Sequence, residues 1–191
     1  MKNDNNDFLE WKQTRSEQII NDKWIDLKKL DYRMPDGSIS GPYYKYKRKD
    51  YVVIVATDDD NKYLCVRQFR QGIGHITTEF PAGAIEDTDI LDEEQKVKNA
   101  LEAAKRELAE ETGYKSDEWR HILTIPSDPT LSENYAYIFS AKKCKKKTEQ
   151  KLDNNEFLNF EIYSKDTLFN MIFKGDFEQP VHVMAAFLER D

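Results

Sequence analysis

One predicted helix carries three glutamates on a single face, and this feature most constrains what the chain can fold into. They are spaced i, i+3, i+4, which brings their side chains together: Glu107, Glu110 and Glu111. Like charges at this spacing weaken a helix by about 0.2–0.5 kcal/mol per pair, so the group calls for a compensating charge. A hard divalent cation with oxygen ligands supplies one, and we expect Mg²⁺, with Mn²⁺ as a substitute. The alternative interpretation is a solvated acidic surface, which runs of charge usually form.

The same helix also carries a packing face. Leu101, Ala104 and Leu108 are spaced i, i+3, i+7 and lie roughly a quarter turn from the acidic face. The helix can therefore pack on a core and present carboxylates at once. Gly113 predicts its C-terminal end, and Arg106 lies four residues before Glu110, where it can brace that carboxylate.

Apolar and β-branched segments predict a sheet beside this helix. Residues 51–56 form a continuous β-branched run, typical of a strand buried on both faces, and an acidic turn leads from it into a second strand at 63–68. Further strands are expected at 76–80, 120–126, 134–141 and 157–163, and helices at 95–112, 165–174 and 180–190. This mixed order predicts an α/β fold with a mixed sheet between helices.

The first 48 residues differ in character from the rest. Within residues 22–48, alternating segments flank a turn at Met34-Pro35-Asp36-Gly37, which predicts a small antiparallel β unit. This unit is too small to stand alone. We therefore expect an N-terminal β unit at 1–48 and a main domain at 49–191.

Composition excludes several classes of protein. Lys and Arg total 29 against 36 Asp and Glu, a formal net charge of −7, which argues against nucleic-acid binding through a basic surface. The first residues have no apolar h-region, and no run approaches the roughly 18 apolar residues of a membrane span. We therefore expect a cytoplasmic protein without a membrane partner.

The cysteines, histidines and a lysine run add little. Cys65 is typical of a strand core, and Cys144 is interpreted as an incidental residue among the lysines of 142–147, which we expect at a solvated hairpin tip. The histidines lack the spacing of a metal pair, so we expect them to be structural or exposed: His75, His121 and His182.

Two segments together resemble the signature of a known family. Residues 79–83 read Glu-Phe-Pro-Ala-Gly, and residues 106–114 read Arg-Glu-Leu-Ala-Glu-Glu-Thr-Gly-Tyr. They resemble the Nudix box, Gly-x5-Glu-x7-Arg-Glu-apolar-x-Glu-Glu-x-Gly-apolar, of Mg²⁺-dependent hydrolases of nucleoside diphosphate derivatives. The resemblance implies a Nudix α/β/α sandwich.

The box contains nine extra residues. Gly83 and Arg106 are 23 positions apart, where the motif has 14. Its first glutamate therefore corresponds to Asp89 when counted forward from Gly83 and to Lys98 when counted back from Arg106. Two nearby acids are candidates to replace it: Glu93 and Glu94.

Residues 67–70, Arg-Gln-Phe-Arg, resemble the ADP-ribose pyrophosphatase branch of these hydrolases when taken with the Glu-x-Pro-Ala-Gly element. This resemblance implies a metal site at the Ala82 carbonyl, Glu107, Glu110 and Glu111. It also implies that Arg70 and Glu79 bind the substrate, with Arg70 on its phosphates, which suits the fixed fork of donors on arginine. The alternative for Arg70 is a surface salt bridge.

Two loops after the box resemble functional loops of the same branch. Glu133, in residues 126–133, corresponds to a loop over the substrate, and Glu156, in residues 153–158, corresponds to an acidic loop that supplies a metal ligand or general base. The catalytic candidates are therefore Glu111, Glu133 and Glu156. Either loop glutamate can also be an ordinary surface acid.

The resemblance extends to Trp24 and Tyr43, which match aromatic residues that sandwich the adenine in homodimers of this branch. The alternative for Trp24 is a place in the core of the small unit. The implied reaction is hydrolysis of ADP-ribose or a related ADP-sugar to AMP and a sugar phosphate. The alternatives are another nucleoside diphosphate derivative, such as NADH or a GDP-sugar, or a ligand-sensing module with weak catalysis.

Overall fold

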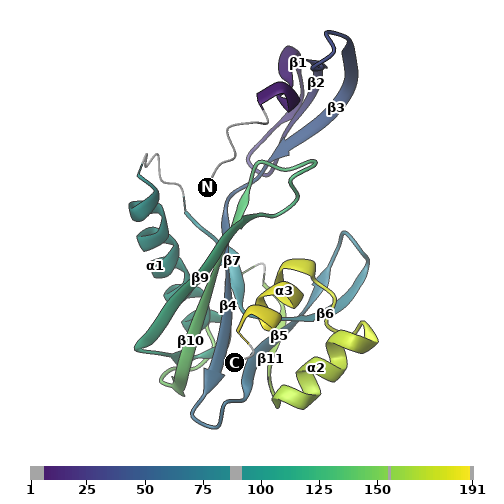
Figure 1. Cartoon of the computed structure of the whole chain (residues 1–191). Helices are drawn as coiled ribbons and strands as arrows, with labels where there is room; N and C mark the ends of the chain where they lie inside the picture. Colours follow the sequence, from purple (N-terminus) through teal and green to yellow (C-terminus); the bar gives the residue numbers. More distant parts are fainter. Residues whose placement is uncertain (1–6, 87–91, 155, 190–191) are drawn as a thin grey trace. The chain divides into compact units, whose positions relative to one another are not determined.

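The computed structural model describes residues 7–86, 92–154 and 156–189. The chain divides into two compact units, and Figure 1 labels most of their elements. The first comprises Met1–Arg48 and Pro126–Asn134, and the second comprises Lys49–Ile125 and Tyr135–Asp191. The loop of residues 126–134, which the sequence places in the main domain, thus clusters with the N-terminal strands.

The first unit is a three-stranded antiparallel sheet in the order β1-β2-β3. It contains a short 3₁₀ helix, η1, and three strands: Asp7–Leu9, β1 Lys12–Asn21, β2 Asp26–Arg33 and β3 Ile39–Lys47. The predicted turn joins β2 to β3, with Gly37 at φ 89°, where glycine avoids the strain of a side chain. β1 was not predicted, because its mostly polar and exposed residues lack a clear alternation.

The second unit is built on a mixed sheet in the order β11-β5-β4-β10-β8, with β6 paired to β5, β7 to β4 and β9 to β10. β4 and β10 are parallel, whereas β4 and β7 are antiparallel. The strands are β4 Tyr51–Asp58, β5 Tyr63–Arg70, β6 His75–Glu79, β7 Ala82–Ala84, β8 Tyr114–Lys115, β9 Glu118–Pro126, β10 Tyr135–Lys146 and β11 Leu158–Tyr163.

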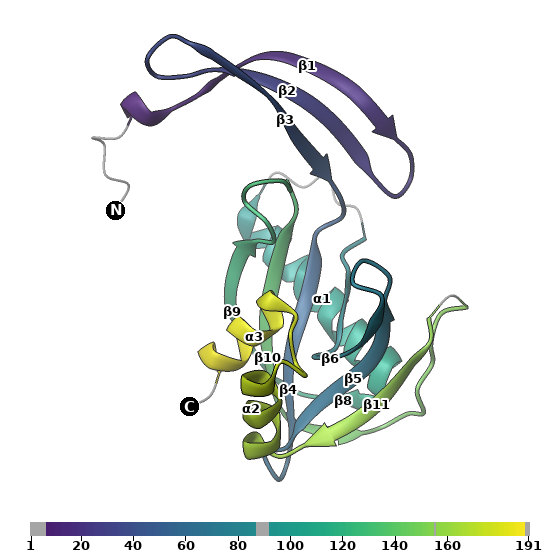
Figure 2. The same cartoon turned by 90° about the vertical axis from the view of Figure 1, so that its right-hand side faces the viewer.

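Helices cover both faces of this sheet. They are α1 Glu93–Thr112, α2 Lys165–Lys174 and α3 Pro180–Leu188, and Figure 2 shows α1 on one face with α2 and α3 on the other. Val52 and Ile54 of β4 pack on the α1 side, and Val53 and Val55 pack on the opposite side. The predicted α/β/α sandwich is therefore confirmed. No helix in the described part of the chain has the length and apolar character to cross a membrane.

Helix α1 follows the pattern read from the sequence. Asp92 caps its first turn by accepting a hydrogen bond from the Glu94 amide, and Gly113 ends it at φ 77°. Ala104 and Leu108 are buried in the core on the α1 side, and Leu101 packs against it. The predicted packing stripe is confirmed.

Two local predictions near the end of β10 are wrong. Cys144 is buried in the core on the α1 side, although its flanking lysines are exposed. Residues 142–146 belong to β10 itself and not to a hairpin tip. The strand is irregular here, with Lys143 at φ 51° and a shift in its register with β4 between Ala141 and Cys144, and this irregularity turns Cys144 inward. The core position predicted for Cys65 is confirmed.

Candidate active site

The centre of the site is the short connection from β6 into β7, which runs along β4. Pro81 lies between the two strands and has no N–H of its own, but its carbonyl accepts a hydrogen bond from the Ile54 amide at 2.9 Å. Ala82 then opens β7 opposite Val53 of β4. Residues 79–83 are thus fixed to a strand that is buried on both faces, which gives the site a rigid base.

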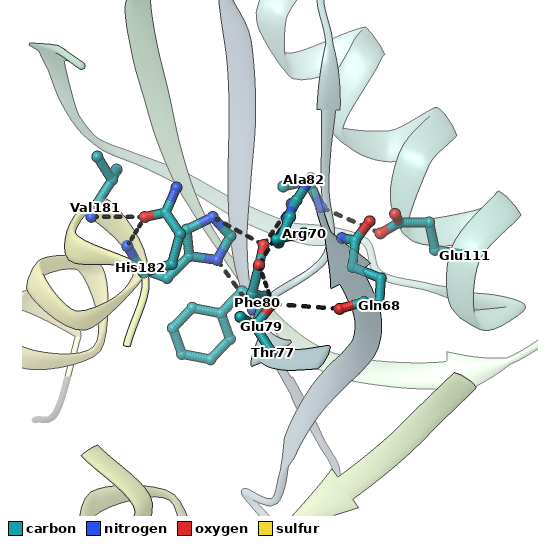
Figure 3. Close-up of polar contacts among 10 residues, drawn as sticks. Gln68, Arg70, Thr77, Glu79, Phe80, Ala82, Glu111, Val181 and His182 are labelled. Carbon is teal, nitrogen blue, oxygen red and sulfur yellow. Dashed lines mark hydrogen bonds and ion pairs between the residues drawn. The ribbon is translucent and has the colours of Figure 1, made fainter. Parts of the chain in front are cut away.

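Two of the three predicted glutamates of α1, Glu107 and Glu111, lie against this connection and are buried. Glu107 is 6% exposed and Glu111 is 2% exposed, whereas Glu110 is half-buried. The Ala82 amide donates a hydrogen bond to Glu111 Oε2 at 3.1 Å, which Figure 3 shows. The solvated acidic surface that was the alternative interpretation is therefore wrong.

Arg106 neutralises part of this acidic group. Its Nη1 donates to Glu110 Oε2 at 2.9 Å, which confirms the predicted brace, and its Nη2 donates to Glu107 Oε1 at 2.7 Å. Nη2 also lies 3.4 Å from the Ala84 carbonyl and so links α1 to β7. One guanidinium therefore holds two of the carboxylates and the strand that they face.

Gly83 is required by the position of Glu107. A Cβ atom at residue 83 would lie 2.1 Å from Glu107 Cδ and 2.2 Å from its Oε1. Real Cβ contacts are never this short, so any larger residue must displace the carboxylate. The glycine that opens the Nudix-like box thus has a steric role, because it provides the space in which the first helix glutamate lies.

The Ala82 carbonyl lies on the edge of β7 that faces α1. The Ile54 and Pro81 pair is hydrogen-bonded, so the neighbouring Val53 and Ala82 pair is a non-hydrogen-bonded pair of the antiparallel ladder. In such a pair the N–H and C=O of one residue both point away from the partner strand. Since the Ala82 N–H binds Glu111, its carbonyl lies on the same side.

Burial dominates the electrostatics of these carboxylates. Desolvation raises the pKa of Glu107 to about 7, even though Arg106 acts in the opposite direction, and repulsion from Glu110 and Glu156 adds to the increase. The pKa of Glu111 is raised well above its ordinary value, first by burial and then by the charge of Glu107. Both groups therefore resist ionisation unless a cation compensates them.

The donor atoms suit a hard divalent cation. Carboxylate oxygens and a backbone carbonyl are the ligands that Mg²⁺ prefers, and Gly83 leaves space for one of the carboxylates. Within residues 7–86, 92–154 and 156–189, no three His, Cys, Asp or Glu side chains already converge as they would around a metal ion. Glu107 and Glu110 are held by Arg106, and Glu111 is held by the Ala82 amide, so metal binding requires these side chains to turn.

Arg70 and Glu79 form a fork on the neighbouring strands. Arg70 Nε donates to Glu79 Oε1 at 2.8 Å and its Nη2 donates to Oε2 at 2.5 Å, and Thr77 Oγ1 donates to Oε1 at 2.5 Å. Burial raises the pKa of Glu79, but the hydrogen bonds from Arg70 lower it below its ordinary value, so this carboxylate is charged. Glu79 is 0% exposed, so its contacts in this structure are with the protein. It holds Arg70, whose side chain remains partly exposed.

The two loop glutamates belong to different units. Glu156 is exposed, accepts a hydrogen bond from the Asp153 amide, and lies close enough to α1 for its charge to raise the pKa of both Glu107 and Glu111. Glu133 lies in the first unit, where it forms an ion pair with Lys45 at 2.5 Å. The structure thus brings Glu156 to the carboxylate group.

The acids proposed to replace the first glutamate of the box lie far from it. Glu93 precedes Glu107 by 107 − 93 = 14 residues on α1, which is about 21 Å at roughly 1.5 Å per residue. Glu93 and Glu94 pair with lysines of the first two turns and are exposed. Neither can share a metal ion with Glu107, so this prediction is wrong. Asp89 lies outside the described residues, and Lys98 pairs with Glu94.

The two aromatic residues predicted to bind adenine have different surroundings: Trp24 is exposed, and Tyr43 packs on other aromatic rings. Trp24 is 71% exposed with the Lys23 ammonium 4.5 Å from its ring centroid, so its predicted alternative as core is wrong. Tyr43 packs with Trp11 and Tyr32, whose ring centroids lie 5.5 and 5.9 Å away. Trp11 was not predicted, because nothing in the sequence links it to residues more than twenty positions away.

Two further residues near the site were not predicted for it. Thr77 orients Glu79, and His182 of α3 contacts the backbone of Phe80. The histidines are otherwise as expected, since His75 and His121 are exposed and His182 is buried. The only signal for His182 in the sequence is a polar residue within the apolar run Val-His-Val-Met-Ala-Ala at residues 181–186.

Comparison with known proteins gives two family matches. The NUDIX domain matches residues 47–184, which is more than half of the chain. The nucleoside diphosphate sugar hydrolase N-terminal domain matches residues 11–45. The boundary between the two matches lies where the sequence changes character, and the N-terminal match extends over β1.

Individual proteins are also similar over most of their length. The ADP-ribose pyrophosphatase of Bacillus subtilis (strain 168) is 31% identical over 162 residues, which cover 84% of this chain and 82% of that protein. The methanol dehydrogenase activator of Bacillus methanolicus is 28% identical over 153 residues, 80% of this chain and 77% of that protein. A crystal structure of an ADP compounds hydrolase has a TM-score of 0.75 at 20% identity, covering 94% of this chain and 92% of that one, which supports the fold.

Proposed function

The chain belongs to the Nudix family, and we propose that it hydrolyses the pyrophosphate bond of ADP-ribose or a related ADP-sugar to AMP and a sugar phosphate. The match of its N-terminal residues to a nucleoside diphosphate sugar hydrolase domain and its similarity to an ADP-ribose pyrophosphatase support this substrate class. The proposal includes Mg²⁺ as the cofactor and a cytoplasmic location.

The observation that carries the proposal is the buried pair Glu107 and Glu111. Two carboxylates that lie almost wholly out of solvent, with raised pKa values, are costly unless their charge has a purpose. Together with Glu110 and the Ala82 carbonyl they supply the oxygen ligands that Mg²⁺ needs. When bound, Mg²⁺ supplies positive charge that stabilises the pyrophosphate in the transition state.

Arg70 is placed to bind the substrate. The fork that it forms with Glu79 fixes the plane of its guanidinium, and its partly exposed side chain keeps donor atoms for phosphate oxygens. Because the charge of Glu79 orients Arg70, this arginine needs little ordering when the pyrophosphate binds. The alternative read from the sequence was that Arg70 forms a salt bridge. Arg70 does form one, with Glu79, and this salt bridge orients the guanidinium for phosphate binding.

A general base completes the mechanism, and we propose Glu156 for it. Water must be oriented and must lose a proton as it attacks phosphorus, and a carboxylate near the metal ligands can accept that proton. Glu156 is exposed and its charge reaches Glu107 and Glu111. Glu133 remains the second candidate, and comparing Glu156→Gln with Glu133→Gln in the rate of hydrolysis decides between them.

We also propose that the protein acts as a homodimer in which Trp24 and Tyr43 stack on the adenine. The exposed Trp24 ring offers a large apolar face, as base stacking requires. Substituting Trp24 by Ala is expected to raise KM for ADP-ribose by about five- to a hundredfold, the equivalent of about 1–3 kcal/mol. An unchanged KM, or a fully active monomer in sedimentation, contradicts this assignment.

The test of the function is a turnover screen. Purified protein is incubated with ADP-ribose, other ADP-sugars, NADH and GDP-sugars, with Mg²⁺ or with excess EDTA, and the released AMP or GMP and phosphate esters are measured. We expect the highest kcat/KM for ADP-ribose or another ADP-sugar, and no turnover in EDTA. Preference for NADH or a GDP-sugar moves the assignment to that substrate, and turnover in EDTA contradicts the metal site.

A second candidate, a regulatory role, is favoured by one observation. This chain is similar to a protein named methanol dehydrogenase activator, and that name supports a role in which the chain acts on another enzyme. The buried glutamates argue that any such role still uses the metal site. If the wild-type protein binds ADP-ribose without releasing AMP in the presence of Mg²⁺, the ligand-sensing alternative replaces hydrolysis.

A further inference from the structure

His182 is a buried polar residue of the second unit that none of the steps above uses. It is 1% exposed and lies in the first turn of α3, where Gln179 accepts hydrogen bonds from the amides of Val181 and His182 and so fixes the start of the helix. Buried imidazoles are costly unless their nitrogens have partners. Its two ring nitrogens both face the connection from β6 to β7.

The first nitrogen binds the backbone of that connection. His182 Nδ1 accepts a hydrogen bond from the Phe80 amide at 3.1 Å, and the imidazole stacks on the Phe80 ring with 10° between the planes. Burial lowers the pKa of His182 to about 4, so the ring is neutral at neutral pH. Because Nδ1 accepts, the ring proton is on Nε2.

The second nitrogen faces the carboxylate that holds Arg70. His182 Nε2 lies 3.9 Å from Glu79 Oε2, so its N–H dipole favours the charged form of Glu79. Among the hydrogen bonds of the described residues, His182 is the side chain that accepts from the Phe80 amide. The imidazole therefore contacts two consecutive residues of the connection, one through each nitrogen.

The connection is thus held from both faces of the sheet, as Figure 3 shows. His182 of α3 binds the Phe80 amide on one side, and Glu111 of α1 binds the Ala82 amide on the other, two residues farther on. Glu79 directly precedes Phe80, and only Pro81 separates Phe80 from Ala82, so a shift at Phe80 moves both Glu79 and the Ala82 carbonyl.

We propose that His182 is a positioning residue, which holds residues 79–82 so that the Ala82 carbonyl and the fork of Glu79 and Arg70 keep the geometry that metal and phosphate binding require. This inference rests on the proposed function for its catalytic consequence. The expected change in Mg²⁺ affinity can be measured without turnover. Positioning groups behind a ligand typically affect metal affinity or activity by about ten- to a hundredfold.

The test compares two substitutions that each keep one nitrogen's role. His182→Asn places an amide oxygen near the position of Nδ1, so it can still accept from the Phe80 amide. His182→Gln places its amide near Nε2, so it can face Glu79 but leaves the Phe80 amide unpaired in a buried position. Val181→Ala, on the same helix, is the matched control, because it removes packing in the core without a polar contact to the connection.

We measure the Mg²⁺ concentration for half-maximal thermal stabilisation without substrate, and kcat and KM for ADP-ribose. His182→Gln is expected to raise the Mg²⁺ midpoint and to lower kcat/KM, each by about ten- to a hundredfold. His182→Asn is expected to remain within about threefold of wild type, and Val181→Ala is expected to change only the Tm. Equal behaviour of the Asn and Gln variants, or a Gln variant that resembles Val181→Ala, overturns the proposal.

A measurement on the wild-type protein keeps the proposal testable if a variant does not fold. The ¹⁵N chemical shifts of the His182 ring report which nitrogen carries the proton. We expect the proton on Nε2, and a proton on Nδ1 overturns the proposal because the Phe80 contact then has no acceptor. If wild type releases no AMP but the Mg²⁺ midpoint still separates Gln from Asn, the proposed function fails and the role of His182 stands.

Discussion

The two ends of α1 carry the same kind of residue in opposite surroundings. Glu93 and Glu94, in the first turn, are exposed and pair with Lys96 and Lys98 at 2.5 and 2.7 Å. Glu107 and Glu111 lie near the other end and are buried. The hydrogen bond from Lys98 lowers the pKa of Glu94, whereas desolvation raises the pKa of Glu107 to about 7.

The difference shows what separates a solvated acid from a functional one. Lysines spaced i+3 and i+4 neutralise the first-turn glutamates, and such exposed pairs contribute little to stability. Near the C-terminal end, Glu107 and Glu110 share Arg106, and Glu111 accepts a hydrogen bond from the Ala82 amide. Their surroundings leave negative charge for a metal ion to balance.

The largest expected effect comes from removing one buried charge. Glu111→Gln keeps the size of the side chain but removes one charged ligand, so we expect kcat for ADP-ribose to fall by on the order of a hundredfold or more. Steady-state hydrolysis at saturating Mg²⁺ measures the change.

Glu94→Gln is the matched control on the same helix. Since Glu94 faces solvent and Lys98, kcat should stay within about twofold of wild type. If both substitutions reduce kcat equally, or if neither does, the functional difference between the two ends of α1 is refuted.

How far the sequence predicts this molecule depends on the range of the interactions. The elements that follow from local patterns were predicted closely, including the strand at 51–56, the helix at 165–174, and the stripe that packs α1. The three-residue β7 and the two-residue β8 were not predicted, because strands this short carry no periodicity and exist only through their partners.

The site shows the same division. The three helix glutamates and the brace from Arg106 follow from helical spacing, which is local. The burial of Glu79 and its contact with His182 join residues about a hundred positions apart, and no spacing rule connects them. The support that Glu79 gives to Arg70 therefore became evident only from the structure.

The second prediction concerns the space beside Gly83 that the Glu107 carboxylate occupies. Gly83→Ala places a methyl group 2.1 Å from Glu107 Cδ, so the carboxylate must move away from β7. We expect the Mg²⁺ requirement to rise and kcat/KM to fall, each by about tenfold to a hundredfold, with some loss of stability. Titration of activity with Mg²⁺ measures both.

Gly72→Ala is the control for this substitution, because nothing lies within 4 Å of a Cβ at that position. Its kinetic constants and Mg²⁺ midpoint should match those of wild type. An unaffected Gly83→Ala enzyme would mean that Glu107 functions in a position other than the one it occupies beside Gly83.

The third prediction uses pH. The pKa of Glu107 is raised from 4.5 to about 7 on folding, so between these values the folded protein binds more protons than the unfolded chain. The free energy of unfolding without metal should therefore fall as pH rises through this range, by about 1–2 kcal/mol after allowance for solvent screening. Glu111, whose pKa is also raised, acts in the same direction.

Mg²⁺ should offset this loss, because it binds the charged carboxylates. Thermal unfolding with and without Mg²⁺ should give a larger difference in Tm at pH about 8 than at pH about 5.5, by roughly 3–6 °C. The Glu111→Gln variant should show a smaller difference at the higher pH. If Mg²⁺ stabilises wild type equally at both pH values, the buried carboxylates are not its ligands.

The smallest expected effect belongs to the solvated end of α1. Asp92 accepts a hydrogen bond from the Glu94 amide and caps the helix, so Asp92→Ala should cost about 1 kcal/mol of unfolding free energy, or a Tm lower by about 2–4 °C. The site lies about 20 Å away along the helix, so kcat, KM and the Mg²⁺ midpoint should remain at wild-type values. Thermal unfolding and steady-state kinetics of the one variant test both statements. A change in the Mg²⁺ midpoint would show that the two ends of α1 are coupled, and that the order of its first turn contributes to the position of Glu107 and Glu111.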